Sequence, residues 1–245
     1  MTRNILEIRN VKKQFGGVHA LNNFSFSIER GTITSIIGPN GSGKTTLVNV
    51  LSGMVPFDDG LIVVGGVGTN VIAPFDLPTL GITRTFQEVR LFEQMTVLDN
   101  LLVVLTERNV WGALFERHTR AHEARARELL KKNGLWEKRD VYAAELSYGQ
   151  RKLLEIARAL AMDVDVYLFD EPYAGLFKEA KNVLTTLMKE LRAEGKTVVL
   201  IEHDMGLIRE LSDVLVVMDA GTLLAAGDPA DVLARRDVIE AYLGT

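Results

Sequence analysis

The chain has 245 residues, of which 47% are apolar and 24% are charged, and its net charge is −4. These values suit a globular protein with a buried core, and the negative net charge argues mildly against a protein that grips nucleic acid. The absence of cysteine excludes disulfides, cysteine-bound zinc, iron–sulfur clusters and thiol catalysis.

The first third of the chain is expected to be rich in strands. Short runs of Ile, Val and Phe predict strands at Ile5–Ile8, Phe24–Ile28, Thr32–Ile37 and Leu61–Val64. Apolar residues then recur at helical spacing from Lys44, and Gly53 ends that pattern. The segment 38–43 is therefore expected to join a strand to a helix.

The middle of the chain, from about Leu91 to Glu145, has a helical pattern. Leucines recur at helical spacing from Leu98 onwards, and the segment 116–139 is crowded with Arg, Glu and Lys, which is typical of solvated helix faces. Two histidines in this segment, His118 and His122, lie four residues apart beside an acid. We favour a solvated helix face over a metal site there, because the surroundings are highly charged.

Strands and helices alternate again towards the C-terminus. The run Val164–Phe169 is almost continuously apolar, as a parallel strand buried on both faces requires. A helix is expected over Val183–Leu191, followed by strands at Thr197–Ile201 and Val214–Met218. This alternation predicts an α/β fold with a mostly parallel sheet. No run approaches the roughly 18 apolar residues of a membrane span, so we expect any role at a membrane to act through a partner.

Residues 38–45 match the phosphate-binding motif G-x-x-x-x-G-K-[ST]. Glycines let backbone N–H groups converge on phosphate oxygens, and the helix N-terminus adds a partial positive charge. We expect Lys44 to reach the β- and γ-phosphates and the Thr45 hydroxyl to bind Mg²⁺. On its own the motif fits a kinase, a GTPase or a transport ATPase. The residues assigned to this site are Gly38, Pro39, Asn40, Gly41, Ser42, Gly43, Lys44, Thr45 and Thr46.

Two acids, Asp170 and Glu171, follow the buried strand. The carboxyl edge of a parallel sheet is where α/β proteins bind ligands, and Pro172 prevents the strand from continuing. We expect Asp170 to hold Mg²⁺ and Glu171 to orient or deprotonate the attacking water. Without the phosphate motif, an acidic turn would be the simpler interpretation.

A second anion site is expected where a helix begins near residue 150. Ser147 and Gln150 form a capping-box pattern, and Gly149 allows close approach by a ligand. A capped helix without a ligand is the simpler alternative. The stretch Leu146-Ser-Tyr-Gly-Gln150 nevertheless resembles the signature motif of ABC (ATP-binding cassette) ATPases, and it lies in the order that this family requires. The resemblance covers essentially the whole chain.

The resemblance implies a P-loop NTPase (RecA-like) core with a mostly parallel sheet, an N-terminal antiparallel β part and an inserted helical subdomain. Residues 1–245 would then be a single domain, with the nucleotide-binding core over 1–90 and 151–245 and the helical subdomain over about 91–150. ATP and Mg²⁺ are the implied cofactors. The signature residues implied to bind the nucleotide are Ser147, Tyr148, Gly149 and Gln150.

Three further positions match the family pattern. Gln87 resembles the glutamine that touches Mg²⁺ and the attacking water, His203 resembles the histidine that contacts the γ-phosphate, and Phe15 resembles the aromatic residue that stacks on adenine. Taken alone, a single Phe or His is more often structural. The chain also departs from the pattern: Tyr148 replaces a common Gly, and Phe177 lies at or near the place of the expected D-loop Asp.

Several segments resemble importer ATPases for branched-chain amino acids and related amino acids, amides or urea, namely Gly81–Gln87, Leu91–Val97, Leu146–Gln150, Ile201–Met205 and Val238–Gly244. The implied partners are membrane permeases, a second ABC ATPase subunit in a homo- or heterodimer and, indirectly, an external solute-binding protein, but not nucleic acid. The implied location is cytoplasmic, on the inner face of the cell membrane through the permeases.

Two alternative functions remain open, the motor of an exporter and a soluble ABC ATPase. We favour the segment from Gln87 to Met95 as the permease contact. The alternative is that Leu91, Phe92 and Leu98 only form subdomain core.

Overall fold

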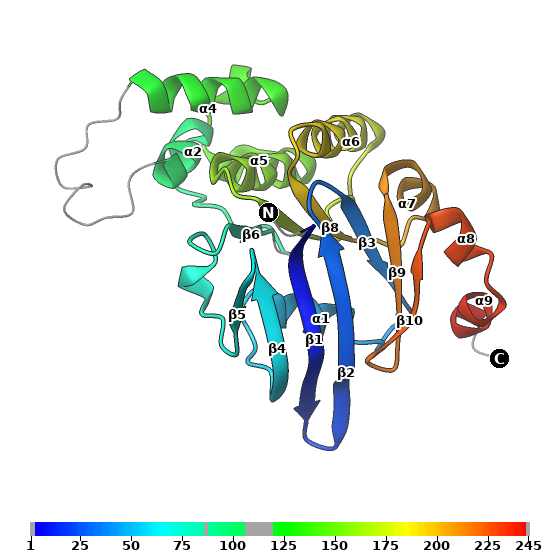
Figure 1. Ribbon diagram of the computed structural model, residues 1–245. Coiled ribbons are helices and arrows are strands. Elements are labelled where there is room, and N and C mark those ends of the chain that lie inside the picture. Colours follow the sequence, from blue (N-terminus) through cyan, green and yellow to red (C-terminus); the bar gives the residue numbers. More distant parts are fainter. Residues whose placement is uncertain (1–2, 86–87, 106–119, 244–245) are drawn as a thin grey trace. The chain divides into compact units, whose positions relative to one another are not determined.

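A computed structural model describes residues 3–85, 88–105 and 120–243 (Figure 1). The chain forms two compact units, the first made of residues 1–84, 165–171 and 188–245 and the second of residues 85–164 and 172–187. The second unit thus extends on both sides of the segment 91–150. The organisation of residues 1–245 as one domain stays a prediction.

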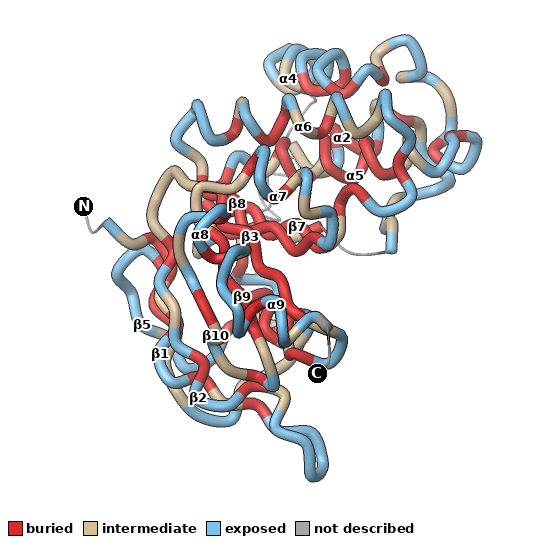
Figure 2. The backbone as a smooth tube through the Cα atoms, turned by 90° about the vertical axis from the view of Figure 1, so that its right-hand side faces the viewer, coloured by how far each residue is buried: buried red, intermediate tan, exposed pale blue. Residues whose placement is uncertain are grey.

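The first unit contains a six-stranded sheet in the order β10-β9-β3-β8-β7-β6, parallel except for β10, which is antiparallel to β9. Figure 2 shows β3, β7 and β8 buried along their length, as is usual for central parallel strands; for β7 this burial was predicted from its apolar run. The strands are β3 (Ile33–Ile37), β6 (Ile82–Arg84), β7 (Val166–Asp170), β8 (Thr197–Ile201), β9 (Val214–Asp219) and β10 (Thr222–Gly227).

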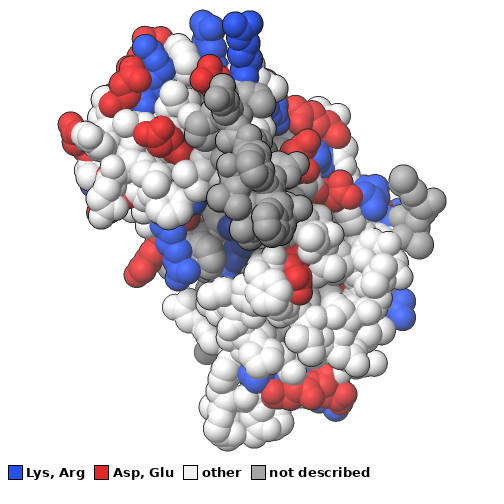
Figure 3. All heavy atoms as spheres, turned by 90° about the vertical axis from the view of Figure 1, so that its left-hand side faces the viewer, with Lys and Arg blue, Asp and Glu red and all other residues white. Residues whose placement is uncertain are grey.

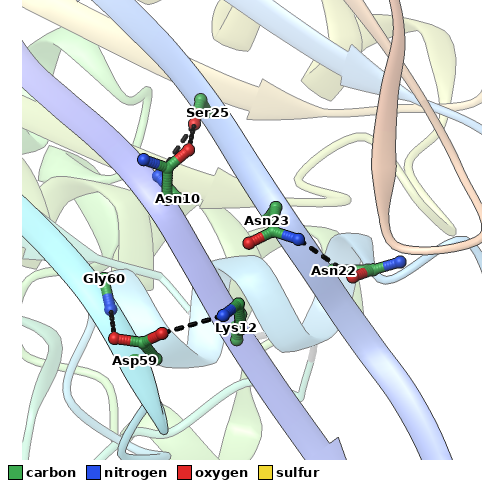
Figure 4. Close-up of polar contacts among 7 residues, drawn as sticks. All are labelled: Asn10, Lys12, Asn22, Asn23, Ser25, Asp59 and Gly60. Atoms are coloured by element: carbon green, nitrogen blue, oxygen red, sulfur yellow. Dashed lines mark hydrogen bonds and ion pairs between the residues drawn. The ribbon is translucent and has the colours of Figure 1, made fainter.

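A second, antiparallel sheet of the same unit has the order β2-β1-β4-β5. Its long strands carry bulges, and Asn10 and Asn23 adopt positive φ angles of 50° and 52° near these shifts of register. Figure 4 shows the backbone N–H of Asn10 donating to Ser25 Oγ at 2.8 Å. The strands are β1 (Asn4–Phe15), β2 (Val18–Glu29), β4 (Asp59–Val64) and β5 (Val67–Thr69).

The core of this unit lies on both faces of the parallel sheet. Helix α1 (Lys44–Leu51) packs between the two sheets, in one apolar cluster with residues of both. Alternate strand residues point to opposite faces, so Ile37 and Val217 join a second cluster with Ile208, Val232 and Val238. These last three lie on α7 (Met205–Leu211), α8 (Pro229–Leu233) and α9 (Arg236–Leu243).

The second unit is helical, as the sequence predicts. Its helices α2, α4 and α5 pack against one another and bury Leu101, Leu130 and Leu154. None of the helices within the described ranges is both long and apolar enough to cross a membrane. The helices are α2 (Val97–Leu105), α4 (Arg120–Lys132), α5 (Tyr148–Ala161) and α6 (Lys178–Ala193), of which residues 188–193 belong to the first unit. Short 3₁₀ turns lie at η2 (Trp136–Lys138) and η3 (Ala143–Glu145). A further such turn, η1 (Pro74–Asp76), lies in the first unit.

Replacing Leu51 by alanine is expected to lower the free energy of unfolding by about 2–5 kcal/mol. The side chain is 0% exposed in the cluster between the two sheets, so its removal leaves a cavity. Urea denaturation measures the effect. The matched control is Val67→Ala at a side chain that is 68% exposed, where a change within about 0.5 kcal/mol is expected. Equal effects of the two substitutions would contradict this account of the core.

Candidate nucleotide site

The phosphate motif forms the loop between β3 and α1, as predicted. Gly38 and Gly43 adopt φ angles of 155° and 100°, which side chains rarely tolerate. A Cβ atom at Gly38 would lie 2.2 Å from Met218 O, and one at Gly43 would lie 2.4 Å from Ala20 O. Glycine is therefore required at both positions by backbone conformation and by space.

Lys44 begins α1 and turns its ammonium group back over the loop. Its Nζ donates to Gly38 O at 2.8 Å and to Pro39 O at 3.0 Å. Burial lowers the pKa of Lys44 below its usual value, and the negative charges of Glu171 and Asp170 oppose that shift. The ammonium group of a buried lysine thus lies close enough to two acids to feel their charge.

A cavity of about 320 Å³ lies beside this loop, a volume in the range of small-molecule sites. It brings together residues that are far apart in the sequence, because β3, β7 and β8 are neighbours whose carboxyl ends meet at one edge. The lining residues are Val18, Ala20, Asn40, Gly41, Gly43, Lys44, Thr45, Thr46, Glu171 and His203.

Glu171 and His203 follow β7 and β8 and contact each other directly. His203 Nε2 lies 2.8 Å from Glu171 Oε1. Glu171 has a φ of 48°, which is unfavourable for a residue with a Cβ, and its N–H donates to Ile201 O at 3.0 Å. The strained backbone and this hydrogen bond aim the carboxylate into the cavity beside the phosphate loop.

Asp170 lies one residue earlier, at the end of β7, and is buried. Its Oδ2 accepts a hydrogen bond from Arg84 at 2.9 Å. Arg84 could not be identified from the sequence, because an arginine at the end of a short strand carries no signal of a buried ion pair. Among the residues expected to bind Mg²⁺, Thr45 and Asp170 offer hydroxyl and carboxylate oxygens, the donor type that Mg²⁺ prefers together with phosphate oxygens. This donor set fits the ion.

Phe15 lies at the end of β1, 48% exposed, and does not line the cavity. Its partner across the β1–β2 hairpin is Val18, which does line it, as does Ala20. Lys13 Nζ lies 5.2 Å from the centroid of the Phe15 ring. The sequence-based assignment missed Val18 and Ala20, whose only signal was their closeness to Phe15 in the chain.

The signature residues belong to the second unit, where the predicted capping box is confirmed. Ser147 Oγ accepts from the N–H of Gln150, and Gln150 Oε1 accepts from the N–H of Ser147 at 3.1 Å. The Tyr148 ring packs on the loop between β7 and α6 so closely that a Cβ atom at Gly175 would lie 2.9 Å from it. Phe177, two residues further on, is 83% exposed.

The predicted site residue Gln87 lies in the segment 86–87, and His118 of the histidine pair lies in the segment 106–119. Gln87 and His118 lie outside the described residues. His122, the other member of the histidine pair, is half-buried on α4. No cluster of three metal-binding side chains occurs among the residues that the structure describes.

A glycine-rich strand–loop–helix beside two acids at the carboxyl edge of a mostly parallel sheet defines a P-loop nucleoside triphosphatase. Residues 21–174 match the family described as ABC transporter. The chain belongs to the ABC transporter family and is an ATP-binding, ATP-hydrolysing cassette of that family.

Known proteins resemble the chain over its full length. It is 39% identical to the high-affinity branched-chain amino acid transport ATP-binding protein BraF of Pseudomonas aeruginosa, with 100% of this chain and 99% of the relative covered. A solved ATP-binding cassette of an ABC transporter in its ADP conformation is 35% identical, with a TM-score of 0.86 and 100% of both chains covered. A dimeric cassette in a post-hydrolysis state with ADP and Pi is 27% identical, with a TM-score of 0.79 over 91% of this chain and 98% of that one.

Proposed function

We propose that the chain is the ATP-hydrolysing subunit that energises an importer of branched-chain amino acids or related amino acids, amides or urea. The observation that carries the proposal is that the phosphate loop, Glu171 and His203 line the same cavity. Full-length similarity to a branched-chain amino acid transport ATP-binding protein supports the class of solute. The ATPase chemistry is common to importers and exporters.

Residues that line the cavity, and others expected beside it, have distinct roles in this proposal. The loop N–H groups and Lys44 bind the phosphates of ATP. Glu171 holds and deprotonates the attacking water, and His203, which contacts Glu171, also reaches the γ-phosphate. Phe15 contacts the adenine. Thr45, Asp170 and Gln87 would hold Mg²⁺, which when bound neutralises charge on the phosphate oxygens.

A second cassette completes the site in this proposal. The Ser147–Gln150 turn of the second subunit would cover the γ-phosphate, because the first-turn N–H groups of α5 form an anion site. Tyr148 is half exposed and Phe177 almost fully exposed, which leaves both side chains accessible to a partner. The dimeric relative supports a two-cassette assembly, either with a second copy or with a related ATPase.

The segment from Gln87 to Met95 would contact a permease and so place the chain at the cytoplasmic face of the membrane. Within its described part, Phe92 and Met95 are 42% and 37% exposed. The buried Asn100 shapes this loop, since its side chain exchanges hydrogen bonds of 3.0 Å with the N–H and C=O of Phe92. A loop whose backbone is fixed by hydrogen bonds and whose apolar side chains are exposed is suited to contact a partner protein.

A role on nucleic acid is not part of the proposal. On the face drawn in Figure 3, Lys and Arg side chains of the described residues are interspersed with Asp and Glu. Proteins that grip nucleic acid by its phosphates use a concentrated positive surface, and the net charge of −4 is of the wrong sign.

The proposal is tested by tagging the chain, solubilising the membranes of its host gently and identifying the co-purifying proteins by mass spectrometry. Recovery of multispanning permeases with a secreted solute-binding protein is expected, and that binding protein can be screened with amino acids, amides and urea. Permeases without a binding protein would favour an exporter. Soluble partners alone, or bound nucleic acid, would overturn the transport role and leave the ATPase assignment in place.

A further inference from the structure

Arg84 is a buried arginine at the end of β6, and its side chain is only 6% exposed. It lies beside β7, where it pairs with Leu168 in the parallel register. Burying a guanidinium group is costly unless its charge is paired and its N–H groups are hydrogen-bonded. The contacts of Arg84 therefore determine whether it belongs to the core alone or also to the nucleotide site.

The guanidinium group joins two elements of the first unit. One terminal nitrogen donates to Asp170 Oδ2 at 2.9 Å. The other donates to Asn49 Oδ1 and to Ser52 Oγ, both at 2.7 Å. Asn49 lies in α1, and Ser52 caps the C-terminal end of this helix. The Ser52 hydroxyl donates a hydrogen bond to Val48 O at 2.7 Å. Arg84 thus bridges the end of β7 to the last turn of α1.

The two bridged elements carry the two described residues expected at the metal. Thr45 lies in the first turn of α1, and Asp170 ends β7. Mg²⁺ requires near-ideal octahedral geometry, so its affinity depends on the spacing and orientation of such oxygens. Arginine suits this bridge, because its planar fork fixes the directions of its donors, whereas lysine is a flexible point charge.

We propose that Arg84 is a positioning residue for the magnesium–nucleotide site, which sets the spacing of α1 and β7 and orients the Asp170 carboxylate through Oδ2. The proposal rests on the proposed role of Asp170 and Thr45 at Mg²⁺. Arg84 itself touches neither the metal nor the nucleotide; it acts through Asp170. Loss of the bridge impairs the affinity for Mg²⁺ more than the affinity for the nucleotide alone.

The test is binding of a fluorescent ATP analogue to the full-length Arg84→Met chain, titrated with Mg²⁺ and repeated in EDTA. The half-saturating Mg²⁺ concentration is expected to rise by about 10- to 100-fold, the usual effect of removing a hydrogen-bond partner of a metal ligand. Affinity in EDTA is expected to change less than about twofold. Without the metal the proposal leaves Asp170, the residue to which Arg84 donates, no role in nucleotide binding. Arg84→Lys, which keeps the charge without the fork, is expected to be intermediate, and it carries the test if Arg84→Met does not fold.

The matched control is Arg30→Met, which removes an arginine–carboxylate pair of 3.1 Å with Asp165 at the opposite end of β7. Its Mg²⁺ dependence is expected to stay that of the unmodified chain. The proposal is overturned if the half-saturating Mg²⁺ concentration is unchanged in both Arg84 variants. It is also overturned if they lose nucleotide affinity equally with Mg²⁺ and in EDTA, and Arg84 is then a structural residue.

Asp170→Asn separates this proposal from the proposed function. If Asp170→Asn raises the half-saturating Mg²⁺ concentration and the Arg84 variants do not, only the role of Arg84 fails. If Asp170→Asn also has no effect, the metal assignment fails, and the role of Arg84 fails with it. In the Asp170→Asn background, Arg84→Met is expected to add less than about twofold, because the two residues act as one unit.

Discussion

Glu171→Gln is expected to lower the rate of ATP hydrolysis by about 10²- to 10⁴-fold, the usual contribution of a general base. Glutamine keeps the length and shape of the side chain, and its amide can retain the 2.8 Å contact with His203 Nε2. It has no basic carboxylate to accept a proton from water. The affinity for ATP is expected to stay within about threefold, because the proposal assigns the binding of the phosphates to the loop and Lys44 and not to Glu171.

Both quantities are measured on the same preparation, turnover by phosphate release and affinity by titration with a fluorescent ATP analogue. Glu29→Gln is the control, since Glu29 is a surface acid at the end of β2 that pairs with Arg3. Turnover near that of the unmodified chain in Glu171→Gln would remove Glu171 from the role of base. Loss of ATP binding in the same variant would instead give it a role in binding.

The phosphate loop could be predicted from the sequence because its chemistry depends on consecutive residues. A helix was predicted to start at Lys44 and a strand to span Thr197–Ile201, and the structure confirms both bounds. Glu171 could be placed near the loop because it follows a buried strand that ends at the ligand-binding edge of the sheet, whereas His203 was assigned by its resemblance to the family histidine. Their direct contact and the positive φ of Glu171 depend on strand order and local backbone conformation, which no run of residues encodes.

The ion pair of Arg84 and the full length of the N-terminal strands could not be predicted from the sequence. The ion pair of Arg84 with Asp170 depends on the pairing of β6 with β7, two strands that are separated by the whole helical segment. Strands β1 and β2 are 12 residues each, longer than the apolar runs within them. Bulges near Asn10 and Asn23 interrupt the alternation of apolar and polar residues. The strands predicted from that alternation were therefore shorter than the strands in the structure.

Lys44→Ala is expected to weaken the binding of ATP itself by about 10- to 100-fold. Its ammonium group lies over the phosphate loop and lines the cavity, and a charge-assisted hydrogen bond contributes about 1.5–3 kcal/mol. Burial already lowers the pKa of Lys44, so the free protein holds this charge at a cost that a phosphate anion would offset. The dissociation constant for ATP should therefore rise both with Mg²⁺ and in EDTA. This differs from the effect expected for Arg84, which depends on Mg²⁺.

The dissociation constant is measured by titration with a fluorescent ATP analogue, and thermal denaturation without nucleotide checks that the chain is folded. Lys189→Ala is the control, because Lys189 is 53% exposed and pairs only at the surface with Glu210 at 2.7 Å, an interaction of little worth to the fold. A folded Lys44→Ala chain with unchanged affinity would refute the assignment of residues 38–46 as the phosphate site. A loss confined to Lys44→Ala would support the assignment of residues 38–46 as the phosphate site, in the cavity that Glu171 and His203 also line.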